Sequence, residues 1–283
     1  MVRPLESRVL GLADREAALG YLARDQVANL FLLDLTARLG SPPEPGEAPT
    51  EIVGTWRDGE MVGVAGLRPN VILDARAGGE VVDALVPYLE SLSVGLVKSF
   101  TPAVDELWRQ LARRRARRAI IDRVETAYAL RACDARLFEA QRDERCRPAV
   151  KADLTDLVVA ARESLREESR PDPFSGDMKG FQRWVRGRVP RARVVECDGR
   201  VAMVGYADVR RPEGWLLQGI YTWPAWRRQG LASFGVSALC REAFDAGADH
   251  VQLAVVDGNT AARRLYEGMG FRPFAKLRTI LFT

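Results

Sequence analysis

The stretch GIYTWPAWRRQGLA, residues 219–232, lies where a predicted strand gives way to a predicted helix. The strand ends at Thr222 and the helix begins near Leu231, with a proline in the loop between them. Gly230 and Ala232 lack bulk, so backbone N–H groups there can approach an anion closely. The amides that open a helix have no partner within it, and the positive end of the helix dipole adds to their attraction for phosphate. The stretch therefore predicts a strand–loop–helix cradle for a phosphate group.

Two arginines stand before the glycine of this loop. Arg227 and Arg228 can add charge-assisted hydrogen bonds to a pyrophosphate. The loop lacks both the P-loop pattern GxxxxGK[ST] and the dinucleotide pattern GxGxxG. Its spacing alone leaves a second interpretation open, in which a glycine-containing turn simply enters an amphipathic helix.

A second pattern lies downstream, in the run DGNTAARRLYEGMGF at residues 257–271. It follows a predicted strand at His250–Val256 and contains a predicted helix at Asn259–Met269. The first pattern, R-x-x-G-x-A at 227–232, and the second, N-x-x-A-x-x-x-Y-x-x-x-G-F at 259–271, together resemble the GCN5-related N-acetyltransferase (GNAT) family.

The resemblance, which is specific over residues 190–283, implies an acetyl-CoA co-substrate and no metal. In this family the fourth and fifth strands splay apart, and acyl-CoA inserts its pantetheine arm between them. Main-chain groups at the end of the fourth strand would polarise the acyl carbonyl, and the loop and helix start would hold the pyrophosphate. The acetyl-CoA-binding residues so implied are Ile220, Tyr221, Thr222, Arg227, Arg228, Gln229, Gly230, Leu231, Ala232, Ser233 and Asn259.

The resemblance also implies that Tyr266 is the general acid that protonates the departing CoA thiolate. A phenol has a pKa of about 10, so it is protonated at neutral pH. The alternative is that Tyr266 is an aromatic residue of the helix face that packs on Phe271.

The general base is less evident. Many relatives use a glutamate on the fourth strand, but the only polar side chain in the segment 216–220 is Gln218. Transfer to an amine needs the ammonium group to lose a proton, to a carboxylate directly or through water. The candidates are a water relay on backbone carbonyls and four carboxylates, which are Glu163, Glu196, Asp208 and Glu213.

The acceptor side in this family is lined by the first helices of the domain and the loop between them. In the corresponding region, residues 163–184, carboxylates stand beside aromatic side chains: Glu163, Glu167, Glu168, Asp172, Phe174, Asp177, Phe181 and Trp184. Such a surface suits a cationic amine. The alternative is a solvated helix end with Phe181 and Trp184 packed inward.

Both halves of the chain predict the same order of elements: helix, hairpin, strand, helix, strand, helix, strand. In this repeat the run TPAVDELWRQL at 101–111 corresponds to NTAARRLYEGM at 259–269. Internal repeats of this kind indicate duplicated domains. We therefore predict an α/β fold of two tandem GNAT-like domains, 1–140 and 141–283, each a mixed, mostly antiparallel sheet flanked by helices.

The first domain lacks the phosphate cradle. Its corresponding junction, residues 74–80, has no R-x-x-G-x-A pattern, and Asp74 and Glu80 would repel a pyrophosphate. Helical periodicity predicts one helix near the start of this domain, over Asp14–Leu39. We interpret the domain as a degenerate GNAT-like unit, similar to the N-terminal partner domain of some bacterial acetyltransferases. A tandem acetyltransferase of the mycothiol synthase type is one specific alternative.

The composition limits the chemistry further. With 47% hydrophobic and 28% charged residues among 283, the chain is an ordinary globular protein. A single histidine, His250, excludes zinc sites built from several imidazoles and disfavours a Ser-His-Asp triad. It begins a strand away from both patterns, which favours a packing role over catalysis. The four cysteines form no metal-ligand spacing and are typical of a reduced cytoplasm.

Charge and hydropathy indicate where the protein acts. The net charge of +4 is a weak bias toward anionic partners. The run Arg113–Arg118 could bind nucleic acid, but cations at a helix C-terminus are favoured by the dipole, so we do not expect a nucleic-acid partner. No apolar run reaches 18 residues and the start lacks a signal-peptide core, so we expect a cytoplasmic protein with no membrane segment.

We therefore expect an acetyl-CoA-dependent N-acetyltransferase that acts by direct attack in a ternary complex. The acceptor would be the primary amine of a small molecule or a peptide, and the oligomeric state is left open. The competing interpretation is a non-catalytic acyl-CoA-binding or interaction protein, in which the missing base reflects lost catalysis.

Overall fold

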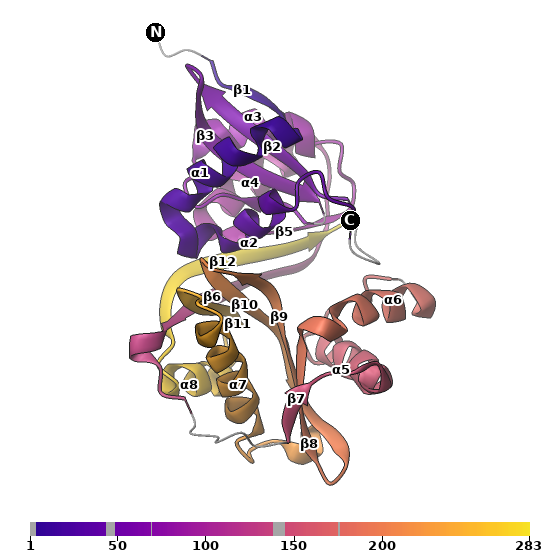
Figure 1. Ribbon diagram of the computed structural model, residues 1–283. Helices are drawn as coiled ribbons and strands as arrows, with labels where there is room; N and C mark the ends of the chain where they lie inside the picture. Colours follow the sequence, from indigo (N-terminus) through magenta and orange to yellow (C-terminus); the bar gives the residue numbers. More distant parts are fainter. Residues whose placement is uncertain (1–3, 44–48, 69, 138–144, 175) are drawn as a thin grey trace.

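The computed structural model describes residues 4–43, 49–68, 70–137, 145–174 and 176–283. Within these residues the chain forms a four-stranded sheet and an eight-stranded sheet, both flanked by helices (Figure 1). None of the helices in these segments is long and apolar enough to cross a membrane. The eight-stranded sheet is mixed, with β10 and β11 parallel, and the four-stranded sheet is antiparallel. The sheets and their helices confirm the predicted α/β class.

The two halves repeat one order of elements, β-α-α-β-β-β-α-β-α-β. The first half contains β1 (Glu6–Val9), α1 (Arg15–Leu22), α2 (Gln26–Ala37), β2 (Glu51–Arg57), β3 (Glu60–Arg68), β4 (Ile72–Leu73), α3 (Gly79–Leu89), β5 (Gly95–Phe100), α4 (Thr101–Arg114) and β6 (Ala119–Arg131). The second contains β7 (Cys146–Pro148), α5 (Leu154–Glu167), α6 (Met178–Arg188), β8 (Ala192–Cys197), β9 (Arg200–Arg211), β10 (Gly214–Thr222), α7 (Leu231–Asp245), β11 (His250–Val256), α8 (Thr260–Gly268) and β12 (Arg272–Phe282). Helices α4 and α8, the elements aligned in the sequence repeat, occupy the same place in each half.

The last strand of each half pairs with the other half. The eight-stranded sheet has the order β5-β12-β6-β11-β10-β9-β8-β7. Strand β12 lies between β5 and β6, and residues Glu125–Arg131 of β6 in turn pair with the whole of β11. In Figure 1, β12 runs as a yellow band between the two lobes. The predicted boundary at residue 140 falls in 138–144, outside the described residues, and the sheet itself joins the two halves across it.

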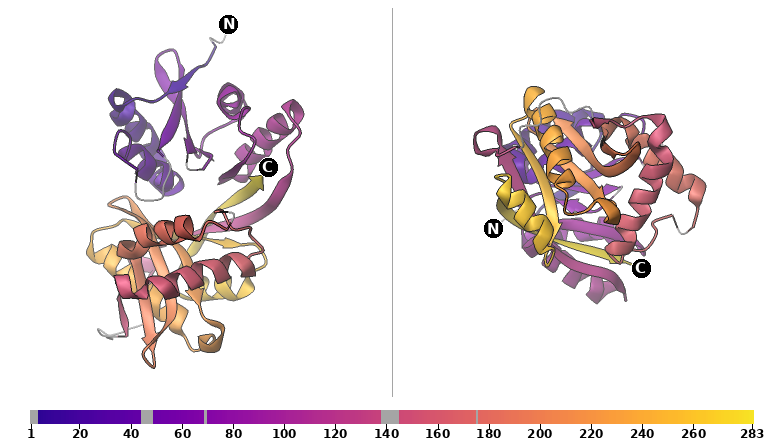
Figure 2. Two further views of the ribbon diagram at one scale, coloured as in Figure 1. Left: turned by 90° about the vertical axis from the view of Figure 1, so that its right-hand side faces the viewer. Right: turned by 90° about the horizontal axis from the view of Figure 1, so that it is seen from below.

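Helices α5 and α6 cover one face of the second-half strands, and α7 and α8 cover the other (Figures 1 and 2). Each face has its own apolar cluster. The cluster under α7 and α8 includes Val236, Leu253 and Phe271, and the cluster under α5 and α6 includes Val158 and Phe181. Burial of such side chains is the main driving force that fixes these layers.

The structure differs from the predicted elements at a few short segments. The helix predicted over 14–39 is two helices, because Asp25 leaves the helical conformation and its carboxylate accepts a hydrogen bond from the Ala28 amide at 3.1 Å, capping α2. Strands β1 and β7, four and three residues long, were not predicted. Such short edge strands carry too few residues for a period-2 pattern to be read.

Candidate functional site

Strands β10 and β11 separate after a short contact. Their parallel pairing is limited to Trp215 with Val251 and Leu216 with Gln252. Strand β10 nevertheless continues to Thr222, still paired with β9. The two strands therefore diverge toward their carboxyl ends, as the family resemblance implied.

A bulge interrupts β10 inside this divergent part. Gln218 pairs with Tyr206 and Tyr221 pairs with Val204, so Gly219 and Ile220 together oppose one residue of β9. Gly219 has a φ of +57°, and a Cβ atom there would lie 2.9 Å from the Tyr206 ring. Only glycine tolerates this conformation and this contact. The bulge takes the main-chain groups of Gly219 and Ile220 out of the regular ladder, where they can bind a ligand.

The loop after β10 leads into α7 through two residues of positive φ, Arg228 at +61° and Gly230 at +78°. Gly230 is the N-cap, and its carbonyl accepts the first hydrogen bond of the helix, from Phe234 at 3.0 Å. The N–H groups of the three preceding helix residues, Leu231, Ala232 and Ser233, have no acceptor among the described residues. A Cβ atom at Gly230 would meet open space. The start of α7 thus offers free amide donors at an accessible helix end, the arrangement expected of an anion site.

The Arg227 side chain forms hydrogen bonds to α5 and to the end of β10. Its Nη2 donates to Glu167 Oε1 at 2.6 Å, and its Nε donates to the Thr222 carbonyl at 2.9 Å. The guanidinium also lies 5.6 Å from the centre of the Tyr221 ring, and the Tyr221 hydroxyl donates to Glu167 at 3.4 Å. Burial, together with the Glu167 charge, raises the pKa of Tyr221. The side chains of Arg228 and Gln229 are exposed.

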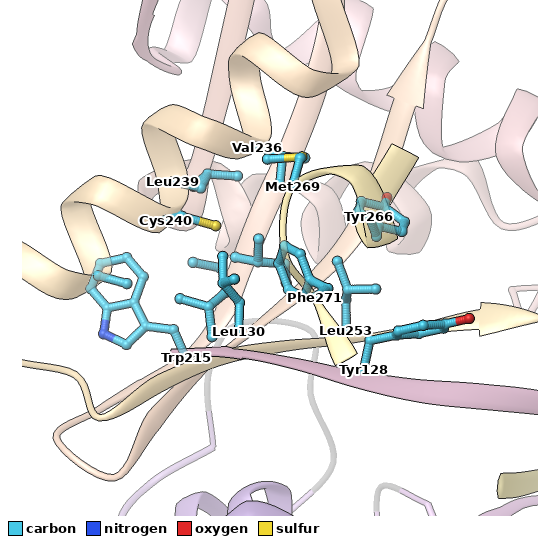
Figure 3. Close-up of a cluster of buried hydrophobic side chains, with 14 of the residues drawn as sticks. Tyr128, Leu130, Trp215, Val236, Leu239, Cys240, Leu253, Tyr266, Met269 and Phe271 are labelled. Carbon is cyan, nitrogen blue, oxygen red and sulfur yellow. The ribbon is translucent and has the colours of Figure 1, made fainter. Parts of the chain in front are cut away.

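Tyr266 lies in the apolar cluster under α8. Figure 3 shows it beside Phe271, on the same side of β11 as Leu253, which follows the last residue paired with β10. The two aromatic rings meet edge to face, 5.6 Å apart at 65°. Tyr266 is only 7% exposed, and burial raises its pKa, so the hydroxyl stays protonated at neutral pH. The packing on Phe271 is therefore present, and the buried phenol also keeps the proton that a general acid needs.

Asn259 caps α8. Its Oδ1 accepts a hydrogen bond from the Ala262 amide at 3.0 Å. The amide nitrogen of the Asn259 side chain remains available as a donor, because no bond to it exists within the part of the chain that the structure describes. No hydrogen bond or ion pair among those residues joins Asn259 or Tyr266 to the loop before α7.

Every carboxylate that the sequence offered as a general base is paired with an arginine. The pairs are Glu163 with Arg166, Glu196 with Arg147, Asp208 with Arg188, and Glu213 with Arg211. The Asp208 pair is the most enclosed, with both side chains 11% exposed. Hydrogen bonds from Arg211 lower the pKa of Glu213. Each of these carboxylates thus has an arginine as its ion-pair partner, and the identity of the general base, one of them or a water relay on backbone carbonyls, stays a prediction.

The predicted acceptor region contains a hollow between α5 and α6. Its volume is about 420 Å³, and its wall combines apolar side chains such as Val158 and Met178 with Glu163. Next to it, Phe174, Phe181 and Trp184 form an aromatic group with ring centres 5.5–6.0 Å apart. Phe181 is fully buried and packs inward.

The corresponding junction of the first half contains a buried carboxylate. Asp74 is fully buried and accepts hydrogen bonds from the amides of Val64 and Arg76, both at 2.8 Å, and from the Tyr21 hydroxyl at 3.2 Å. From the sequence, we expected Asp74 to repel a phosphate through its charge. The structure adds that Asp74 already occupies donors at this junction. Glu80, the second acidic residue, pairs with Arg57.

Potential metal ligands do not gather at the site. Among the described residues, no group of three or more His, Cys, Asp or Glu side chains is placed to hold a metal ion. His250 is fully buried, and a Cβ atom at Gly214 would lie 2.5 Å from its ring. The histidine therefore packs against β10.

Comparison with known proteins adds a family and a fold. Residues 154–271 match the sequence profile of the Acetyltransferase (GNAT) family. No curated protein matches the chain significantly.

Three solved structures are similar along nearly the whole chain. A Drosophila protein is 14% identical over 97% of this chain and 98% of its own, with a TM-score of 0.71. A GCN5-related N-acetyltransferase from Sphaerobacter thermophilus is 16% identical over 98% and 95%, with a TM-score of 0.58. A tandem GNAT protein from the clavulanic acid biosynthesis pathway is 14% identical over 98% of each chain, with a TM-score of 0.52. At these identities the likeness shows a shared fold.

Proposed function

Because residues 154–271 form a domain of the GNAT acetyltransferase family inside a tandem GNAT fold, we propose that the protein is an acetyl-CoA-dependent N-acetyltransferase. Its acceptor is the primary amine of a small molecule or a peptide, which attacks the acyl donor directly. The reaction is carried by the second half, which holds the family match together with the splayed strand pair and the open start of α7.

The observation that carries the proposal is the start of α7. The free amides of Leu231, Ala232 and Ser233 lie at the end of a β10 that has parted from β11. These donors fit the pyrophosphate of acetyl-CoA, which supplies an activated acyl thioester when bound. Arg228 is exposed beside them and adds a positive charge.

Main-chain groups at the bulge of β10 would orient and polarise the acyl carbonyl. Gly219 and Ile220 stand outside the ladder for this purpose, and Tyr221 and Thr222 follow them. As the amine nitrogen bonds to the acyl carbon, the carbon–sulfur bond breaks and Tyr266 gives its proton to the leaving sulfur. Before the attack the ammonium group loses one proton to water held on backbone carbonyls, which frees the lone pair of the nitrogen. The nitrogen loses a second proton to the same water once the carbon–nitrogen bond has formed, and the Tyr266 phenolate regains a proton from solvent, so the protons balance.

Thiol release from acetyl-CoA across a panel of primary amines tests this function. Replacing Gly230 by Glu should abolish turnover and acetyl-CoA binding, because a carboxylate would then stand among the phosphate donors. Gly247→Glu is the matched control, since Gly247 also has positive φ (+82°) and open space around its Cβ position but lies at the far end of α7. Wild-type turnover that survives in Gly230→Glu would refute the proposed site.

Tyr266→Phe tests the general acid separately. Loss of a general acid costs about 100-fold in kcat or more, and the binding of acetyl-CoA should change little. The phenylalanine keeps the ring that packs on Phe271, so folding is preserved. A kcat equal to that of the wild type would remove Tyr266 from the mechanism.

A second function, a non-catalytic acyl-CoA-binding protein, is favoured by one observation. All four carboxylates considered as bases are engaged by arginines. Tight binding of acetyl-CoA without turnover of any amine would support this second function, and failure to bind acetyl-CoA would exclude both.

A further inference from the structure

Two adjacent glutamates at the end of α5 form hydrogen bonds and ion pairs with different parts of the protein. Glu167 accepts hydrogen bonds from Arg227 and Tyr221, which belong to the proposed acetyl-CoA side of the second half. Glu168 faces the other way and pairs with Arg123, whose Nη2 lies 2.9 Å from Glu168 Oε2. Arg123 belongs to β6, a strand of the first half.

Arg123 is itself held in place by a buried carboxylate. Its Nε donates to Glu125 Oε1 at 3.1 Å. Glu125 is 3% exposed and also binds Lys98 of β5 and the Thr279 hydroxyl of β12, the latter at 2.8 Å. Burial alone would raise the pKa of Glu125, but the charges of Lys98 and Arg123 and the hydrogen bonds from Lys98 and Thr279 together outweigh it and hold the pKa at about 2. Glu125 therefore remains an anion, and Arg123 has a fixed anchor.

We propose that Arg123 is a positioning residue through which the first half shapes the acceptor side of the site. The proposal rests on the proposed function. The guanidinium uses two different nitrogens for two carboxylates, so it spans the distance between the shared sheet and α5. The chain that follows Glu168 leads into the region of Phe174 and Trp184, next to the hollow between α5 and α6. The α5 residues that line this hollow end at Glu163, so Arg123 acts on the acceptor side indirectly, through the end of the helix and the chain that follows it.

Lysine cannot replace arginine in this role. An ammonium group is a single point of charge and has no fork of donors to bridge two carboxylates. In Arg123→Lys the ammonium neutralises Glu125, the more buried partner, and the contact to Glu168 is lost. Because the buried Glu125 carboxylate stays paired in this variant, the protein should remain folded. Any kinetic change then reflects the lost contact that positions Glu168.

The experiment measures steady-state kinetics with acetyl-CoA and the amine of the panel that gives the highest kcat/KM. Arg123→Lys and Glu168→Gln should each raise the KM for the amine about tenfold, the effect of losing one charge-assisted contact. The kcat and the KM for acetyl-CoA should change less than about threefold, because the α7 donors are untouched. Glu168→Gln leaves the contacts of the buried Glu125 intact. It therefore tests the proposed role of the Arg123–Glu168 pair even if changes at Arg123 impair folding. Arg114→Gln, which breaks another arginine–glutamate pair of the first half, is the control with unchanged kinetics.

A measurement without an amine separates this inference from the proposed function. Hydrogen exchange of the amides of residues 168–170, which close the end of α5 by bonds to Ser164, Leu165 and Arg166, should be faster in both variants than in the wild type. If exchange at these amides is unchanged, the inference is wrong whether or not the protein turns over an amine. An unchanged KM for the amine in both variants, with an active wild type, also overturns it.

Discussion

His250, the only histidine of the chain, makes the stability of the folded protein depend on pH. It is fully buried, with Nδ1 3.3 Å from Asp249 Oδ2 and with Nε2 lacking a partner among the residues that the structure describes. Burial lowers its pKa below 6.5, and the nearby Asp249 only partly opposes this shift. The folded protein therefore holds a neutral imidazole.

This residue predicts a loss of stability in mild acid. Below pH 6.5 the unfolded chain binds a proton at His250 more readily than the folded chain does. The contribution of His250 is therefore complete above pH 6.5 and is lost as the pH falls through its folded pKa. Urea denaturation at a series of pH values between 7.5 and 5 should show this loss, and His250→Phe should reduce it. An NMR titration of the single imidazole at or above pH 6.5 would contradict the prediction.

At the scale of elements, helix α8 is capped at its N-terminus by Asn259, a residue that was also predicted to bind acetyl-CoA. Asn259 accepts from the Ala262 amide and closes the first turn. Asn259→Ala should lower the free energy of unfolding by about 1 kcal/mol, measured by urea denaturation. Asn259→Asp keeps the capping oxygen and should retain the wild-type value. Equal stability of the alanine and aspartate variants would show that the cap contributes nothing.

Local signals explain which elements and site residues could be predicted. The hairpin turns at Asp58-Gly59 and Asp198-Gly199 adopt positive φ, and both were readable from the sequence. The backbone cradle at Gly230 was readable for the same reason, since glycine adopts a positive φ more readily than any other residue. The partner of Arg227 was not, because a long side chain binds whichever carboxylate the fold brings near it, and Glu167 lies on a different helix.

At the scale of the whole molecule, the halves share one sheet through exchanged strands. The existence of β6 and β12 follows from their own sequences, which predict a strand near the end of each half, but their partners do not. Strand pairing between distant segments depends on contacts across the whole chain, whereas periodicity reports only the local face of a strand.

The exchange predicts that neither half is stable by itself. A fragment 145–283 would expose the edge of β11 that β6 covers, and a fragment 1–137 would expose the edge of β5 that β12 covers. Unpaired edges of this kind favour aggregation. Each fragment alone should aggregate, and the two produced together should form a 1:1 complex in size-exclusion chromatography with light scattering. A monomeric 145–283 that unfolds cooperatively would refute the prediction.

The exchanged strands also determine when the sheet can form during synthesis on the ribosome. Strand β5 is made early, but its neighbour β12 is complete only when residue 282 has been added. At about 5–20 residues per second, the first half waits roughly eight to thirty seconds after β6 is made before its sheet can close. During that interval the nascent chain carries an open strand edge at β5, which favours pairing with other chains.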